Sequence, residues 1–356
     1  MDPARLIPTP DTIPAPWGFF EFLLILTFFA HLVFMNAMLG TAMIALVREM
    51  RSQPDAPPPC RDIASKLPYT IAFAVNFGVA PLLFLQVLYG HFIYTSSILM
   101  GAYWLSVIGL LILAYYSAYL YKMAGDLPAA ARKRALATSL VLLLTIAFLF
   151  VNNITLMQTP QVWTVYFHKP DGTFLNLADP TLLPRYLHFV VASVAAGGLF
   201  LAILAFFQQK NSEPGAEKRL SAGMKWFTYA TVVEIGTGIP FLFSLPKNVH
   251  QLFLGGAPLH TALFTAALIA AFCSLYYGAK ERVWPATFAM ATTVLFMVLV
   301  RDLARQAYLA RYFHPADLQV VPQWSPMFLF LAVLVIGVAV VIHMLRLAAR
   351  VPEEAR

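Results

Sequence analysis

Long apolar stretches separated by short polar segments set the pattern of this chain. About 20 apolar residues form a helix long enough to cross the hydrocarbon layer of a membrane, which is about 30 Å thick. Nine stretches reach or exceed that length, and little chain is left between them. We therefore predict an all-α, polytopic membrane bundle of nine transmembrane helices, at about 17–46, 68–97, 101–123, 135–158, 184–207, 222–245, 258–278, 283–308 and 326–347.

Composition agrees with this pattern. Sixty per cent of the 356 residues are hydrophobic and 12% are charged, whereas a soluble domain carries about 25% charged residues. Because the helices use nearly the whole chain, residues 1–356 are predicted to form a single integral membrane domain. The two cysteines lack the spacing of a covalent haem attachment, so any redox centre is expected to be held non-covalently.

Lysine and arginine are distributed unevenly between the two sides of the predicted bundle. The segments of one side, with the adjoining helix ends, carry 17 of the 24 basic residues, which leaves seven for the other side. Because basic loops tend to stay on the cytoplasmic side of a membrane, the N-terminus is predicted to face out and the C-terminus to face in. The net charge of +7 reflects this bias and does not indicate a nucleic-acid site.

Ionisable side chains within the spans are few, and such groups usually mark a function because they are costly to bury in lipid. His188 and His260 lie four and two residues after prolines at the starts of their helices, so each lies within about one turn of the outer boundary. Two imidazoles at one depth can ligate one haem iron, and Ala192 and Ala195 are expected to leave a groove for the ring. The alternative is two interfacial histidines bonded to headgroups or loop carbonyls.

Five stretches of the chain are distinctive: FFAHLVFMNAMLGTAMIAL, NFGVAPLLFLQVLYG, NNITLMQTP, LLPRYLHFVVASVAAGGLFLAIL and VRDLARQAY. In the same order, they resemble parts of subunit I of the cytochrome bd quinol oxidases. The resemblance implies that His31 and His188 ligate haem, and that His188 ligates the low-spin haem b. It also implies that Asp302, Arg305 and Gln306 hold the places of the family's acidic residue and Arg-Gln pair.

The chain departs from the family at positions that bear on its chemistry. Gln86 stands where the family's second helix carries a glutamate, and His260 stands where the family uses methionine as the second ligand of the low-spin haem. The third helix has no acidic residue, and the outer quinol-binding loop is reduced to SLPKNVHQLFLGGAPL. Because dioxygen reduction needs a proton relay and Glu234 is the only carboxylate in mid-membrane, we expect no oxygen reduction.

Several candidate residues have open alternatives. His91 either ligates a second haem opposite His31 or bonds at the outer interface. Glu234 either takes a quinol proton or bonds across helices. Asp302 and Arg305 either have a function or simply neutralise each other as i, i+3 neighbours. As a functional pair they either hold haem propionates, since arginine binds carboxylates through two hydrogen bonds, or replace the family's acidic ligand.

The sequence therefore favours a membrane subunit that binds one to three haems b and oxidises a quinol such as menaquinol. Its electrons would pass to a periplasmic, multihaem c-type cytochrome, and its location would be a bacterial inner membrane. Glu234 and Gln86 are its candidate catalytic residues. Two other functions stay open, namely a true quinol:oxygen oxidoreductase and a non-redox transporter or assembly subunit.

Overall fold

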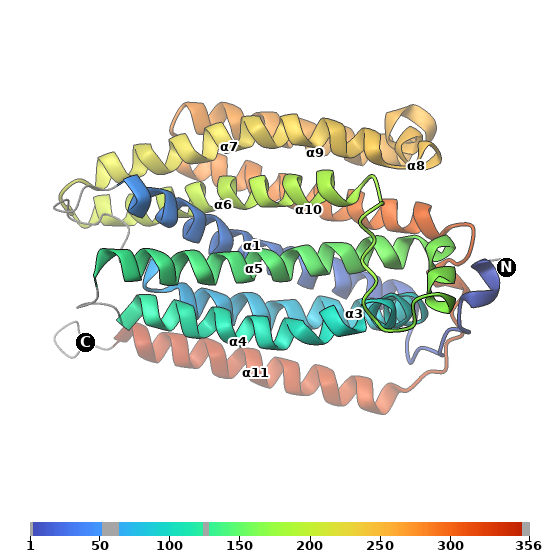
Figure 1. Ribbon diagram of the computed structural model, residues 1–356. Coiled ribbons are helices and arrows are strands. Elements are labelled where there is room, and N and C mark those ends of the chain that lie inside the picture. Colours follow the sequence, from blue (N-terminus) through green and yellow to red (C-terminus); the bar gives the residue numbers. More distant parts are fainter. Residues whose placement is uncertain (1–2, 52–63, 124–127, 351–356) are drawn as a thin grey trace.

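The computed structural model describes residues 3–51, 64–123 and 128–350. In these ranges the chain forms nine long helices that lie side by side (Figure 1). They are α1 (Trp17–Arg51), α3 (Leu67–Leu99), α4 (Gly101–Met123), α5 (Ala129–Gln158), α6 (Leu182–Lys210), α7 (Ala216–Ser244), α9 (Pro258–Ala279), α10 (Val283–Leu309) and α11 (Trp324–Arg350). Each long helix contains one of the nine apolar stretches, so the predicted all-α membrane bundle is confirmed.

Eight of the described helices are long and apolar enough to span a membrane on their own. The ninth, α7, meets that test together with the two short elements that follow it, α8 (Lys247–Gln251) and the π-helical turn η3 (Leu252–Gly256), after a bend of 118°. Pro246 precedes α8, and a proline there cannot continue the α7 hydrogen-bond ladder. The shortened outer loop expected from the sequence is therefore a helical segment folded across the end of the bundle.

The helices run up and down, so that α1 begins at one end of the bundle and α11 ends at the other (Figure 1). This agrees with an odd number of spans and with termini on opposite sides of a membrane. Short turns gather at the end where α1 begins, namely η1 (Pro3–Leu6), η2 (Pro160–Phe167) and η4 (Pro315–Asp317). There Ile13 pairs with Val320, which ties the segment before α1 to the segment before α11.

Helix α6 packs closely against α1 on one side and against α7 on the other, and glycines lie at both contacts. A Cβ atom built on Gly40 of α1 would lie 1.7 Å from the Ser193 carbonyl oxygen, and one on Gly197 would lie 2.4 Å from the Gly40 carbonyl carbon. On the other side, a Cβ on Gly198 would lie 2.5 Å from the Phe227 backbone nitrogen of α7. Small residues let membrane helices approach closely without a hydrophobic driving force. The run of small residues in α6 therefore positions α6 between α1 and α7.

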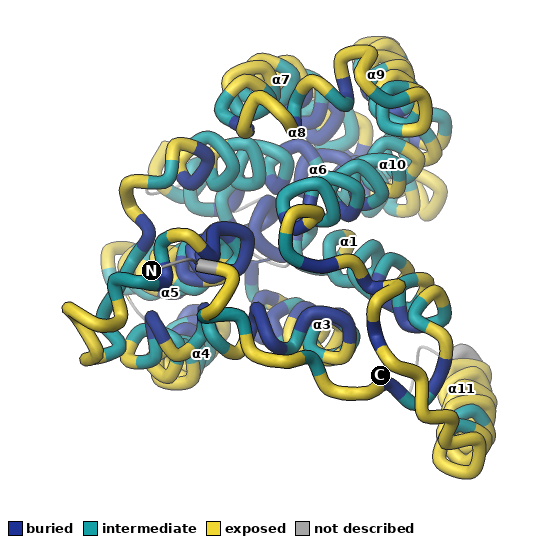
Figure 2. Tube along the Cα trace, turned by 90° about the vertical axis from the view of Figure 1, so that its right-hand side faces the viewer, coloured by how far each residue is buried: buried dark blue, intermediate teal, exposed yellow. Residues whose placement is uncertain are grey.

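The outside of the bundle is apolar. Large hydrophobic side chains are exposed along most helices, and α11 is exposed over nearly its whole described length (Figure 2). In water such a surface would aggregate, whereas lipid tails solvate it. The chain is a multi-pass membrane protein, and the polar groups inside it must satisfy one another or serve a function.

Candidate functional site

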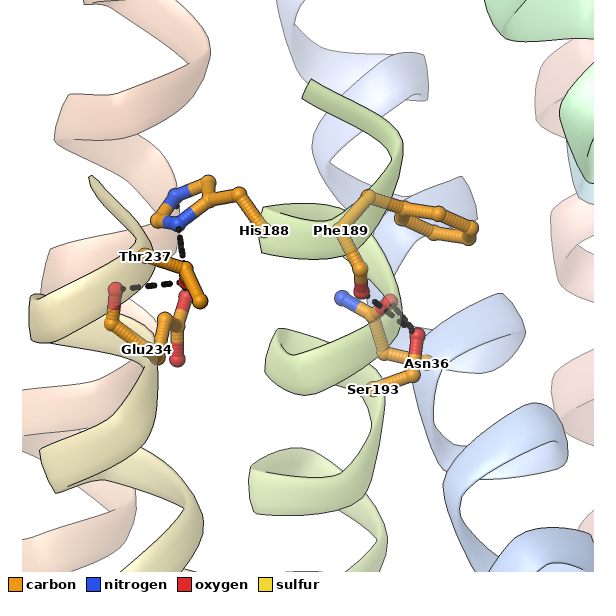
Figure 3. A network of polar contacts seen from close by, with 6 residues as sticks. All are labelled: Asn36, His188, Phe189, Ser193, Glu234 and Thr237. Atoms are coloured by element: carbon orange, nitrogen blue, oxygen red, sulfur yellow. Dashed lines mark hydrogen bonds and ion pairs between the residues drawn. The ribbon is translucent and has the colours of Figure 1, made fainter. Parts of the chain in front are cut away.

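His188 and Glu234 face each other across the contact between α6 and α7 (Figure 3). The His188 Nε2 and the Glu234 Oε1 atoms are 3.9 Å apart, and His188 Nδ1 lies 3.4 Å from the Thr237 hydroxyl oxygen. Thr237 in turn donates its hydroxyl proton to the Glu234 backbone carbonyl at 3.0 Å. The imidazole and the carboxylate thus form one site, although the sequence analysis treated them separately.

The local sequence explains how this site forms. His188 lies in the second turn of α6, on the side that meets α7, and its ring rests beside Gly238, where a Cβ atom would lie 3.4 Å from the ring. Phe241, one turn further along α7, packs on the same ring with the centroids 5.8 Å apart. Gly238 and Phe241 together leave a slot of one ring's width for the imidazole.

Neither nitrogen of His188 makes a short hydrogen bond. A distance of 3.4 Å is at the limit of a real hydrogen bond and 3.9 Å is beyond it, so a nitrogen lone pair remains available to another group. The side chains of His188 and Glu234 are 23% and 21% exposed. Both side chains are therefore only partly buried.

One turn deeper, a second polar contact fixes the opposite side of α6 (Figure 3). Ser193 donates its hydroxyl proton to Asn36 Oδ1 of α1 at 2.8 Å, and both side chains are buried. Sequence analysis did not single out this pair. The signal was present, because each residue is a lone polar side chain in an apolar stretch.

His31 has the surroundings of a metal-ligating histidine. Its Nδ1 atom lies 3.0 Å from the Ala74 carbonyl oxygen of α3, so the ring donates its N–H there and keeps the Nε2 lone pair. A Cβ on Gly78 would lie 2.9 Å from the His31 ring, so only glycine allows the ring this position. A hydrogen bond from the second nitrogen to a backbone carbonyl is the usual way in which a protein orients a histidine ligand.

The structure does not bring His91 and His31 together. His31 of α1 contacts α3 at Gly78, whereas His91 belongs to α3 and lies 13 residues further along it, a distance of about 20 Å. His91 packs among aromatic rings, with the Phe313 centroid 4.5 Å away, and its Nε2 atom is buried without a hydrogen-bond partner among the described residues. Its surroundings are those of a core histidine with one unsatisfied nitrogen.

His260 lies in the first turn of α9, where its ring packs edge-on against Phe253 of η3 with the centroids 5.3 Å apart. Its Nδ1 atom is buried and has no hydrogen-bond partner in the described part of the chain. Helices α7 and α9 lie next to each other over α6 in both overall views (Figures 1 and 2). His188 and His260 therefore belong to one group of three helices, at the end where α6 and α9 begin.

A polar network joins α10 to α1, and its Asp302 and Arg305 side chains are buried. Arg305 and Asp302 form an ion pair, and Gln306 donates through Nε2 to Asp302 Oδ2 at 2.8 Å and to Glu21 Oε1 at 2.5 Å. The Arg305 guanidinium lies 4.6 Å from the ring centre of Tyr89 on α3. The mutual neutralisation of Asp302 and Arg305, one of the two alternatives above, is present, and Glu21 is a partner that sequence analysis missed.

Two further residues named from the sequence are Ala195 of α6 and Gln86 of α3. The prediction of a porphyrin groove along α6 is wrong at Ala195, because that side chain is fully buried against α7 in a cluster with Met224 and Phe227. The small residues serve helix packing there instead. Gln86 is partly buried on α3, and no hydrogen bond of its side chain is present in the described structure.

No family model matches the chain, and no curated protein matches it by sequence. A solved structure does: the structure of bd oxidase from Geobacillus thermodenitrificans contains a chain that is similar with a TM-score of 0.62. The chain has a bd oxidase fold. The similarity covers 99% of both chains at 14% sequence identity, so it extends over the whole helix arrangement. The resemblance inferred from five short stretches is thereby confirmed at the level of the fold.

The donor atoms of the site fit a haem. His31 keeps one nitrogen lone pair after its carbonyl contact, the His188 nitrogens make only long contacts, and His260 has a buried nitrogen without a partner. Neutral imidazole nitrogens are the usual ligands of haem iron. These three histidines therefore have the chemistry that the sequence prediction requires.

Proposed function

We propose that this chain is a haem b-binding subunit of a respiratory complex that oxidises a quinol, such as menaquinol. In this proposal the electrons pass to a periplasmic c-type cytochrome, which carries several haems. The complex lies in a bacterial inner membrane, with the N-terminus of this chain outside. The proposal takes its general class from the bd oxidase fold and its details from the residues of this chain.

The observation that carries the proposal is the His188–Glu234 pair. Oxidation of a quinol to a quinone releases two electrons and two protons, so a site for it needs an electron acceptor and a proton acceptor close together. Glu234 lies 3.9 Å from His188, and both side chains are partly exposed. A carboxylate beside a candidate haem ligand, within reach of a lipid-soluble substrate, meets that need.

Each residue has a defined part in the proposed site. His188 and His260 hold one low-spin haem b, His31 holds a further haem, and Asp302 with Arg305 fixes propionate groups. The haem, when bound, supplies a one-electron acceptor. His91 has no part in holding the haem of His31, because about 20 Å of helix α3 separates His91 from the contact of His31 with Gly78.

Glu234 acts on the substrate. Its carboxylate accepts a proton from a quinol hydroxyl, and Thr237 supports it through the hydrogen bond to the Glu234 backbone. The carboxylate then releases the proton toward the outer end of α7, where Ser244 ends the helix and α8 begins. General acid–base groups of this kind contribute about 10²–10⁴-fold to a rate.

A true quinol:oxygen oxidoreductase is the second candidate, because the fold similarity to a bd oxidase covers the whole chain. We favour the first candidate because Gln86, an amide, occupies the place where the family resemblance expects a glutamate. An amide cannot pass on a proton as a carboxylate does.

A visible spectrum of the purified, dithionite-reduced protein tests the proposal. Sharp haem b bands that also form when menaquinol is added without oxygen support the first function. An additional band shifted to the red, with sustained oxygen uptake, supports the oxidase instead. A protein without any Soret band refutes both and leaves a transporter or an assembly subunit.

A further inference from the structure

A cavity of about 460 Å³ lies between the end of α6, the start of α7 and the turn from α9 to α10. These elements meet at the end of the bundle where α1 and α11 end (Figure 1), the side that the lysine and arginine distribution assigns to the cytoplasm. Phe206 in the cavity is 18 residues of α6, about 27 Å, from His188. The cavity is therefore separate from the site described above.

The cavity has an apolar wall and a charged rim. The wall includes Phe206, Leu220 and Trp284, and the rim has the side chains of Glu217, Glu281 and Arg282.

The turn from α9 to α10 holds Glu281 at this rim. Its φ of 52° is in the left-handed region, and its backbone N–H donates to the Gly278 carbonyl oxygen at 3.0 Å. A Cβ atom on Gly278 would lie 2.8 Å from the Thr228 hydroxyl oxygen, so the glycine lets the end of α9 approach α7. Ser221 of α7 donates its hydroxyl proton to Glu281 Oε1 at 2.7 Å, which orients the carboxylate.

The apolar wall has the residues of a membrane–water boundary. Trp284 packs edge-on against Phe206 and Phe207, with the ring centroids 5.9 and 6.1 Å apart, and it is 40% exposed. The Lys210 ammonium lies 5.1 Å from the ring centre of Phe206. Tryptophan is enriched where headgroups meet acyl chains, and lysines near helix ends extend toward water there. The cavity therefore lies at the depth of lipid headgroups.

The charges at the rim do not neutralise one another. Among the residues that the structure describes, no ion pair includes Glu217, Glu281 or Arg282, and all three are exposed. Arg282 directly precedes α10, and the first backbone N–H groups of a helix have no partner within it and favour an anion. The rim thus offers two carboxylates to a cation, and a guanidinium beside a helix N-terminus to an anion.

We propose that this cavity binds a phospholipid whose headgroup carries a primary ammonium group, such as phosphatidylethanolamine. Glu217 and Glu281 accept hydrogen bonds from the ammonium, and Arg282 with the start of α10 binds the phosphate. The apolar wall takes the glycerol and the adjoining acyl carbons. The volume is within the range of about 300–1,000 Å³ that is usual for small-molecule sites.

The rim selects among phospholipids by its chemistry. Phosphatidylglycerol has the phosphate but no cation, so both carboxylates stay unbalanced. Phosphatidylcholine has a cation, but its quaternary ammonium has no N–H group to donate. A primary ammonium headgroup satisfies both parts of the rim.

Native mass spectrometry of the delipidated, full-length protein tests the site. Phosphatidylethanolamine, phosphatidylglycerol and phosphatidylcholine with the same acyl chains are titrated separately, and the dissociation constant of the first bound lipid is measured. Phosphatidylethanolamine should bind about tenfold more tightly than the other two, the equivalent of one hydrogen bond to a charged group. Equal affinities for the three lipids would overturn the proposal.

Variants assign this selectivity to the rim. The double change Glu217→Gln with Glu281→Gln should weaken phosphatidylethanolamine about tenfold and should not weaken phosphatidylglycerol. Arg282→Gln should weaken both lipids, because both carry the phosphate. Glu213→Gln is the matched control, since this exposed carboxylate pairs with Arg219 and lies outside the cavity lining. A double variant that keeps the selectivity, or a control that loses it, would refute the site.

Soluble phosphoethanolamine separates a lipid site from a site for the headgroup alone. It has the same ammonium and phosphate, but it lacks the carbons that contact the apolar wall. It should displace phosphatidylethanolamine only at concentrations about a hundredfold higher. Displacement at equal concentration would exclude the lipid as the occupant. None of these measurements involves haem or quinol, so the result does not depend on the proposed function.

Discussion

Two polar regions of the bundle differ in how completely their groups are satisfied. At the α6–α7 contact, His188 has one partner at 3.4 Å and another at 3.9 Å, and the side chains of His188 and Glu234 are 23% and 21% exposed. At α10, the ion pair of Asp302 and Arg305 is buried and is extended by Gln306 with hydrogen bonds of 2.8 and 2.5 Å. The first region can accept a ligand or a proton, whereas the second mainly holds charges in place.

This difference indicates how the two regions should respond to mutation. Where the side-chain contacts are long, a substitution should leave the fold intact but abolish ligand binding or proton transfer. A region with short contacts inside the protein should lose stability when one partner is removed.

His188→Ala should remove the low-spin haem completely while the protein still folds, because alanine offers no donor atom and the ring has no short bond to break. The measurement is the haem content of the purified variant together with its thermal unfolding. Retention of every haem would show that His188 is not a haem ligand and would support its alternative role as an interfacial histidine. A collapse of the fold would remove the contrast between the two regions.

Asp302→Asn should destabilise the protein by about 3–5 kcal/mol, because it leaves the Arg305 charge buried without its partner. The free energy of unfolding in detergent is the measurement. The double variant Asp302→Leu with Arg305→Met is the matched control, and it should lie within about 1–2 kcal/mol of the unchanged protein because no unpaired charge is left. If Asp302→Asn lowered the free energy of unfolding by less than about 1 kcal/mol, the ion pair with Arg305 would not be a strong stabilising contact.

Glu234→Gln should slow the reduction of the haem by menaquinol about a hundredfold, the lower end of the range for an acid–base group. The haem content should not change, because Glu234 is not proposed as a ligand. Stopped-flow absorbance without oxygen gives the rate. Glu213→Gln is the control, since this residue lies exposed in the turn before the same helix. Equal rates in all three proteins would exclude Glu234 as the proton acceptor.

His260→Met should keep the haem and raise its midpoint potential by about 59 mV, a tenfold change in the redox equilibrium constant, because methionine favours reduced iron more than histidine does. The potential is read from the same haem band as in His188→Ala. An unchanged potential would mean that His260 does not touch the iron.

The helices could be predicted from the sequence because lipid imposes a length and a polarity on each span. The segment after Pro246 could not, since α8 and η3 are five residues each and too short to give an apolar stretch of their own. Gly255 adopts a φ of 110° there, which favours glycine and breaks any regular pattern. A run of hydrophobic residues carries no information about such a turn.

The site was only partly predictable. The histidines stood out because they interrupt apolar stretches, but the pairing of His188 with Glu234 depends on how α6 and α7 are rotated about their axes. The contact of Gly198 with Phe227 sets that rotation, and hydropathy does not encode it.

The close contact of Gly40 with Gly197 also has a consequence for the time course of synthesis. These residues are separated by 157 positions, the same separation as the Asn36–Ser193 hydrogen bond beside them. A ribosome adds about 5–20 residues per second, so Gly197 is synthesised about 8–30 s after Gly40. During that interval the Gly40 surface of α1 has no α6 to pack against, so α1 enters the membrane with this surface uncovered.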